Sequence, residues 1–241
     1  MSDRPAFYAL EPGGWRDYWS LLHPPYTLWH LSYVVLGAAT VDEIELRWLG
    51  ETLLAFFFAM GVAAHALDEL NGRPLRTRIP SGVLIGLAVA GLAGAVALGV
   101  HGMVEVSPWL GVFIAVGVFL VVAYNLELAG GAFHSDLWFA VAWGGFPVLT
   151  AAFAQTATVT PAALAVALAC VAISAAQRAL STPVRMLRRS AVQVAGEIEL
   201  HDGGRVPVDA ATLRGPSEAA LRLLSLAVPA LAVGALFARL S

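Results

Sequence analysis

The chain has 241 residues, of which 59% are hydrophobic and only 13% are charged, and its mean hydropathy is +0.74. A typical soluble domain carries about 25% charged residues, so this composition excludes a soluble globular protein and places the chain in a lipid bilayer. The formal net charge of −3 argues against a nucleic-acid partner. The single cysteine, Cys170, excludes an intrachain disulfide.

Residues 1–24 are predicted to contain a short amphipathic helix in the membrane interface. Trp15, Tyr18, Trp19 and Leu22 recur at helical spacing. Aromatic side chains prefer the boundary between lipid and water, so we expect this segment to lie on the membrane surface rather than to cross it.

Seven apolar segments follow, each close to the ~20 residues that a helix needs to cross the hydrocarbon core. They are Tyr26–Val41, Trp48–Leu67, Gly82–Val100, Trp109–Tyr124, Leu137–Ala154, Ala162–Leu180 and Ala219–Phe237. The pattern predicts an all-α polytopic membrane bundle of about seven transmembrane helices. We expect one transmembrane domain over residues 1–241.

The connections between these segments differ in charge, which predicts the orientation of the chain. Three arginines follow the second segment and five follow the sixth, whereas the connection 41–51 is acidic. Cytoplasmic loops carry an excess of basic residues. We therefore expect an integral protein of the cytoplasmic membrane, with its N-terminus and its arginine-rich loops in the cytoplasm.

Residues 190–218 form the longest polar segment and are predicted to be a cytoplasmic loop that contains a hairpin. The stretch Glu197–Val208 alternates between polar and apolar residues around Asp202-Gly203-Gly204. Such alternation around a glycine turn is typical of a two-stranded hairpin. Isolated hairpins are only marginally stable, so we expect this one to pack on the bundle.

A first polar cluster ends the second apolar segment. His65, Asp68 and Glu69 stand at positions i, i+3 and i+4, so they share one face of a helix. One interpretation is that they are polar groups at a helix end that reach the interface. The other is a divalent cation on the carboxylates beside an anionic ligand, which would contact Asn71, Arg73, Arg76 and Arg78.

A second polar cluster lies between the fourth and fifth segments and comprises Tyr124, Asn125, Glu127, His134 and Asp136. Asp136 or Ser135 could simply cap the fifth helix. Glu127 and His134 have no such explanation, because ionisable residues at membrane depth are costly. With the first cluster they make a candidate His/carboxylate metal site, whose mixed ligands suit zinc, iron or manganese as well as magnesium.

At these clusters the first 180 residues, roughly, resemble the UbiA superfamily of intramembrane aromatic prenyltransferases. The family ends its second helix with an Asp-rich motif followed by Arg-Pro-Leu and a Ser-Gly helix start. Here Asp68 and Asn71 precede Arg73-Pro74-Leu75 and Ser81-Gly82, and the matches continue with Tyr124, Gly144 and Pro147. The second Asp-rich motif of the family is missing, because Ala176–Arg185 contains no carboxylate.

The resemblance implies a helical bundle with a cytoplasmic-side cavity in which Mg²⁺ and an isoprenyl diphosphate bind. Asp68, Glu69 and Glu127 are then the candidate catalytic groups, and Arg178 and Arg185 assist in binding the diphosphate. The expected function is metal-dependent transfer of a prenyl group to a small or lipid acceptor. Two alternatives remain: different metal-dependent lipid chemistry, such as hydrolysis or oxidation, and a non-enzymatic lipid-binding membrane subunit.

Overall fold

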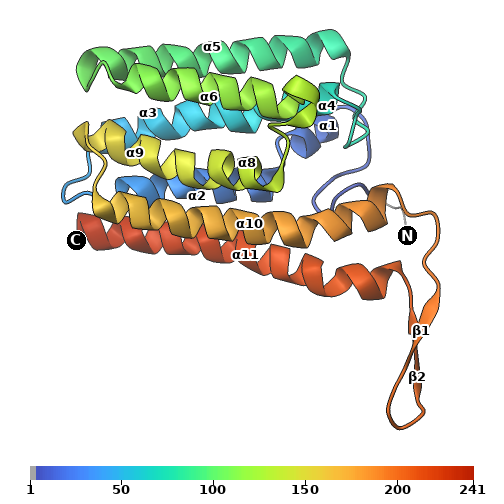
Figure 1. Ribbon diagram of the computed structural model, residues 1–241. Coiled ribbons are helices and arrows are strands. Elements are labelled where there is room, and N and C mark those ends of the chain that lie inside the picture. Colours follow the sequence, from blue (N-terminus) through green and yellow to red (C-terminus); the bar gives the residue numbers. More distant parts are fainter. Residues whose placement is uncertain (1–3) are drawn as a thin grey trace.

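The computed structural model describes residues 4–241, which form a bundle of helices and one small hairpin (Figure 1). The first half contains α1 (Trp15–Leu21), α2 (Pro24–Ala38), α3 (Leu46–Phe56), η1 (Phe57–Ala64), α4 (His65–Leu70), α5 (Ser81–Glu105) and α6 (Leu110–Asn125). The second half contains α7 (Leu128–Gly131), α8 (Asp136–Ala140), η2 (Val141–Gly145), α9 (Phe146–Thr156), α10 (Pro161–Arg189), β1 (Gly196–Glu199), β2 (Arg205–Val208) and α11 (Ala210–Leu240).

Each predicted apolar segment forms a helix, which confirms an all-α membrane bundle. Within the described residues, five helices are long and apolar enough to cross a membrane: Leu46–Leu70, Ser81–Glu105, Asp136–Thr156, Pro161–Arg189 and Ala210–Leu240. The first and third of these are continuous helices that contain the π-helical segments η1 and η2. The helices α6 and α2 are shorter, with 16 and 15 residues.

The bundle is layered, with α5 and α6 along one side and α10 and α11 along the other (Figure 1). Between these pairs lies α2, which packs against α9, α10 and α11. Its Trp29 and Tyr33 are fully buried, and the indole N–H of Trp29 donates to the Tyr33 hydroxyl at 2.5 Å. The hydroxyl of Ser174, from α10, donates to the same oxygen at 3.2 Å. These buried polar groups therefore satisfy one another.

The contact between α2 and α9 depends on a glycine. A Cβ at Gly37 would overlap the Val148 carbonyl oxygen and lie 2.8 Å from the Val148 Cα. We expect Gly37→Ala to lower the free energy of unfolding by at least about 2 kcal/mol, because backbone must move to make room. Gly86→Ala is the control, since a Cβ there meets nothing within 4 Å. Denaturation of both variants in micelles measures the difference, and equal stability would contradict this packing.

The predicted hairpin is confirmed, but its expected packing is wrong. Strands β1 and β2 are antiparallel with Ile198 opposite Val206, and Gly203 has a φ of +82° in the turn. Both strands are exposed almost throughout, and the hairpin points away from the helices (Figure 1). The loop is also shorter than predicted, because Asp209 caps α11 through the Thr212 N–H and the helix begins at Ala210.

Candidate functional site

A cavity of about 420 Å³ is lined by residues of α4, of α10 and of the N-terminal segment. Helices α2, α6 and α11 and the segments η1 and η2 also contribute to its wall. Most of the predicted site residues line this cavity: His65, Asp68, Asn71, Tyr124, Asn125, Glu127, His134, Arg178 and Arg185. The structure thus brings the two polar clusters and the sixth apolar segment to one place.

One wall of the cavity is positively charged because α10 directs three arginines to it, Arg178, Arg185 and Arg189. The Arg178 guanidinium donates to the Asp136 carboxylate at 2.7 Å. Arg189 donates to the Pro5 carbonyl oxygen at 3.3 Å. Arg185 has a weaker partner, the Thr182 hydroxyl at 3.2 Å. Arginine matches the geometry of phosphate oxygens, so this wall suits a phosphorylated ligand.

Asp68, from α4, contributes a carboxylate to the same cavity. No hydrogen bond or ion pair within 4.0 Å holds this carboxylate among residues 4–241. Arg189 and Arg185 interact with it electrostatically over a longer distance, as does His134. Asp68 is therefore the predicted acidic residue that the structure leaves available to a ligand.

Three histidines of the cavity use the same ring nitrogen, Nδ1, for a hydrogen bond to a backbone carbonyl oxygen. The Nδ1 atoms of His30, His65 and His134 lie 3.0, 3.1 and 3.0 Å from the carbonyl oxygens of Trp143, Gly61 and Tyr124 respectively. Because a carbonyl oxygen only accepts, each neutral ring carries its proton on Nδ1. The Nε2 atoms keep their lone pairs and can accept a proton or a hydrogen bond.

A fourth histidine, His23, stacks on His65 with 4.1 Å between the ring centroids and 13° between the planes. Its Nδ1 lies 2.7 Å from the Tyr8 hydroxyl. Burial lowers the pKa of His23 well below its usual value, and the neighbouring His65, Arg189 and Arg185 lower it further. His23 is therefore neutral at pH 7. Burial also raises the pKa of Tyr8, so its phenol stays protonated.

Glu69 does not lie in the cavity with the other predicted site residues. Its carboxylate is buried, with 1% of the residue exposed, and faces the loop that follows α4. It accepts hydrogen bonds from the backbone N–H groups of Leu75 and Thr77 at 2.9 and 2.8 Å and from the Thr77 hydroxyl at 2.9 Å. These bonds occupy both oxygens, so Glu69 shapes the loop and does not line the cavity.

The three arginines after α4 also lie away from the cavity. Arg73 is folded back on its own loop and donates to the Ile79 carbonyl at 2.6 Å and to the Ser81 hydroxyl at 2.9 Å. Arg76 and Arg78 are exposed. The prediction that these residues contact an anionic ligand therefore receives no support from the geometry, and α10 supplies the basic wall instead.

The candidate metal ligands do not converge. Within residues 4–241, no three His, Cys, Asp or Glu side chains come close enough to hold a metal ion. Glu127 is half exposed and 4.0 Å from His134, and Glu69 faces the loop. A His/carboxylate transition-metal centre does not fit this arrangement. Protein sites hold Mg²⁺ with one or two carboxylates plus phosphate oxygens, so Asp68 fits a magnesium ion that a diphosphate shares.

Several cavity residues were not predicted as site residues, namely Tyr8, His23, His30, Gln177 and Arg189. On α10 the signal was the spacing of polar residues, because Ser174, Gln177, Ser181 and Arg185 repeat every three or four positions along an apolar segment. That spacing places them on one helix face. The N-terminal segment gave no comparable signal, since only the tertiary fold brings Tyr8 to His23.

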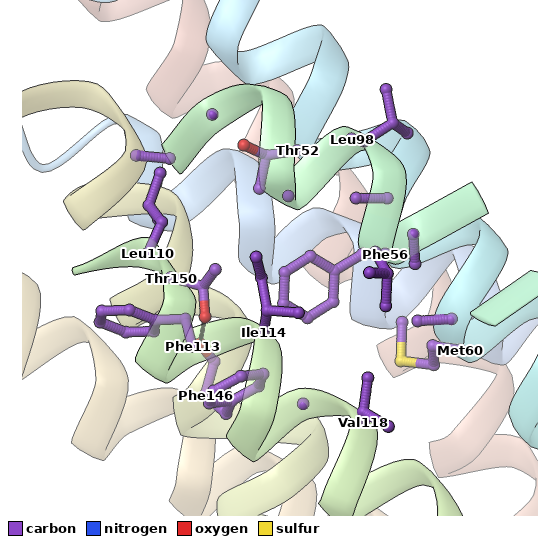
Figure 2. Close-up of a pocket in the computed structure, with 18 of the residues that line it drawn as sticks. Thr52, Phe56, Met60, Leu98, Leu110, Phe113, Ile114, Val118, Phe146 and Thr150 are labelled. Atoms are coloured by element: carbon purple, nitrogen blue, oxygen red, sulfur yellow. Dashed lines mark hydrogen bonds between the residues drawn. The ribbon is translucent and has the colours of Figure 1, made fainter. Parts of the chain in front are cut away.

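A second, apolar pocket of about 120 Å³ lies between α3, η1, α5, α6, η2 and α9 (Figure 2). Phe56, Leu98, Phe113, Ile114 and Phe146 are among the side chains that line it. They surround a common space in Figure 2. Its lining is almost entirely hydrocarbon, so this pocket suits the chain of a lipid.

The two pockets are neighbours. Met60, from η1, and Trp143, from η2, line both of them. Both residues lie on π-helical segments, which often mark functional sites because they interrupt the regular helix. The adjacent Gly144 allows η2 to approach α10 closely, since a Cβ there would lie 2.6 Å from the Cys170 carbonyl oxygen. The polar cavity and the apolar pocket thus meet at one pair of side chains.

Comparisons of the chain with protein-family models, with curated proteins and with solved structures found no match.

Proposed function

We propose that this protein binds an isoprenyl diphosphate and transfers its prenyl group to a small or lipid acceptor within the membrane. The diphosphate would lie in the polar cavity against Arg185 and Arg189, and the isoprenoid chain would enter the apolar pocket. The observation that carries this proposal is the junction of the two pockets at Met60 and Trp143. An amphiphile with an anionic head and a long apolar chain matches both sides of that junction.

We further propose a UbiA-like bundle of seven spans, with α2 and α6 as the two shorter ones. Their apolar sequences, and their positions among the five longer helices, support this topology. The arginines at the cavity end favour a cytoplasmic location for the site. The substrate would then enter from the cytoplasmic leaflet, which suits a phosphorylated head group.

In the proposed reaction the bond between C1 of the isoprenyl group and the diphosphate oxygen breaks, and the diphosphate leaves with the electron pair. The acceptor forms a new bond to C1 and loses one proton. Arg185 and Arg189 would stabilise the negative charge that develops on the leaving group. His65, with its Nε2 lone pair in the cavity, or Asp68 would take the proton. A magnesium ion bound with Asp68 would add further positive charge.

The proposal is tested by the binding of geranylgeranyl diphosphate to the protein in nanodiscs with Mg²⁺. We expect this ligand to bind at least tenfold more tightly than geranylgeraniol, which lacks the charge, and than free diphosphate, which lacks the chain. When an extract that contains the acceptor is added, the protein should release one diphosphate for each prenylated product. Equal affinity for all three ligands would refute the proposal.

A non-enzymatic lipid-binding function is the second candidate. One observation favours it. Among the described residues, Asp68 is the single carboxylate without a partner in the cavity, and no group of three side chains that could hold a metal ion forms around it. Tight binding of geranylgeranyl diphosphate with no release of diphosphate would support this candidate over prenyl transfer.

A further inference from the structure

Three arginines outside the polar cavity have exposed side chains with almost no partners. They are Arg16, on α1, and Arg76 and Arg78, in the loop between α4 and α5. Among residues 4–241, none of the three forms an ion pair. Within the same residues, the one hydrogen bond from their side chains runs from Arg16 to the Gly13 carbonyl oxygen at 3.4 Å. Three positive charges are therefore available to a partner of opposite charge.

Arg76 and Arg78 stand close to the ends of two apolar helices. Their loop joins two helices that are long and apolar enough to cross a membrane, the first ending at Leu70 and the second beginning at Ser81. Arg78 is three residues before Ser81, and Arg76 is six residues after Leu70. In a bilayer the polar head groups lie just outside the hydrocarbon core, so this spacing places both guanidinium groups at the level of the head groups.

The loop is held against α4 and α1, so its arginines do not extend into water on a free segment. Glu69 of α4 accepts from the N–H groups of Leu75 and Thr77 at 2.9 and 2.8 Å. Asp17 of α1 is 4% exposed and accepts from the Arg78 backbone N–H at 3.1 Å. The backbone that carries the exposed Arg78 side chain is thus bonded to α1, and the loop and this helix form one continuous surface.

Aromatic side chains lie beside these charges. Trp15, Tyr18 and Trp19 of α1 are 70%, 44% and 46% exposed, and their spacing of i, i+3 and i+4 places them on one face of the helix. Asp17 points the other way, into the protein. Exposed tryptophan and tyrosine are typical of segments at the boundary between lipid and water. A soluble acidic partner would give these rings no apolar environment, whereas a lipid does.

We propose that α1 and the loop 71–80 form a binding surface for acidic phospholipids. Arginine binds phosphate oxygens in a two-pronged geometry, and basic residues beside a membrane span are attracted to acidic lipids. The rings of α1 insert between the head groups, while Arg16, Arg76 and Arg78 contact the negative charges. This surface goes beyond the proposed prenyl transfer and does not depend on it, because none of the three arginines lines the polar cavity.

The test compares two lipids with the same acyl chains, dioleoyl phosphatidylglycerol and dioleoyl phosphatidylcholine. Each is titrated into the protein in detergent micelles, and native mass spectrometry counts the bound molecules. We expect the unmodified protein to prefer phosphatidylglycerol by about 25-fold, since Arg76 and Arg78 each contribute roughly fivefold. Replacing both in one variant, Arg76→Gln with Arg78→Gln, should bring this preference below about threefold.

Two control variants separate charge from other effects. Arg76→Lys with Arg78→Lys keeps both charges and should keep a preference of at least about tenfold. Arg205→Gln removes one charge from the exposed hairpin and should leave the preference unchanged. Neither Arg76 nor Arg78 holds the fold through its side chain, so all variants should remain folded. Equal affinity for the two lipids in the unmodified protein, or an unchanged preference in the double glutamine variant, would overturn the proposal.

A further variant tests the contribution of α1. Trp15→Ala with Trp19→Ala should weaken the binding of both lipids at least about threefold and leave their ratio unchanged, because the rings contact lipid of either charge. Unchanged affinity for both lipids would overturn the joint surface of helix and loop.

Geranylgeranyl diphosphate separates this proposal from the proposed function. Its affinity should stay within about twofold when Arg76 and Arg78 are both replaced by glutamine, because these residues lie outside the cavity. If the unmodified protein fails to bind geranylgeranyl diphosphate but prefers phosphatidylglycerol, the prenyl-transfer proposal fails and the lipid surface stands. If it binds geranylgeranyl diphosphate without preferring phosphatidylglycerol, the lipid surface alone fails.

Discussion

Arg185→Gln is expected to weaken the binding of geranylgeranyl diphosphate by about 100-fold, because it removes a positive charge from a partly buried site. Losing one partner of a desolvated, hydrogen-bonded charge pair typically costs about 2–5 kcal/mol, and 100-fold corresponds to about 2.7 kcal/mol. Calorimetry on the protein in nanodiscs measures the effect. Arg205→Gln is the matched control, since Arg205 lies on the exposed hairpin with 68% of its side chain accessible.

Arg185 is the most informative of the three arginines because it has the weakest partner. Arg178 is already neutralised by Asp136, and Arg189 holds the Pro5 carbonyl of the N-terminal segment. Among residues 4–241, Arg185 is hydrogen-bonded only to the Thr182 hydroxyl of its own helix. An affinity in Arg185→Gln that matches the Arg205→Gln control would show that the basic wall does not bind the diphosphate.

The membrane bundle was predictable because apolar segments of spanning length determine helices in lipid, whatever their tertiary contacts. The hairpin was predictable for a similar local reason, the alternation around Asp202-Gly203-Gly204. The position of the hairpin away from the bundle was not predictable, because the sequence of two four-residue strands does not show what they contact. Local sequence likewise does not reveal the π-helical segments, which place Met60 and Trp143 between the two pockets.

The candidate site was predicted in part. The face shared by His65 and Asp68 follows from helical spacing, and both line the cavity. Glu69 is one residue further along the same helix, and rotation by a single residue is enough to direct it to the loop. Arg73 could not be assigned either, because its partners are two backbone carbonyls and the Ser81 hydroxyl, which only the folded loop brings to it.

Glu69→Ala is expected to lower the free energy of unfolding by about 3–5 kcal/mol. The substitution leaves the N–H groups of Leu75 and Thr77 and the Thr77 hydroxyl without their acceptor, and each buried unsatisfied group costs about 1–3 kcal/mol. Denaturation in mixed micelles measures the change. Glu43→Ala, at an exposed loop position, is the control and should change the stability by less than about 0.5 kcal/mol.

Glu69→Gln distinguishes a loop acceptor from a metal or substrate ligand. The amide keeps one acceptor oxygen and replaces the other with a donor, so we expect a loss of stability between those of Glu69→Ala and the control. Binding of geranylgeranyl diphosphate to the folded fraction should be unchanged, because the carboxylate faces the loop. If Glu69→Gln were as stable as the unmodified protein but no longer bound geranylgeranyl diphosphate with Mg²⁺, Glu69 would be a ligand of the site. The sequence pattern would then describe this residue better than the loop geometry does.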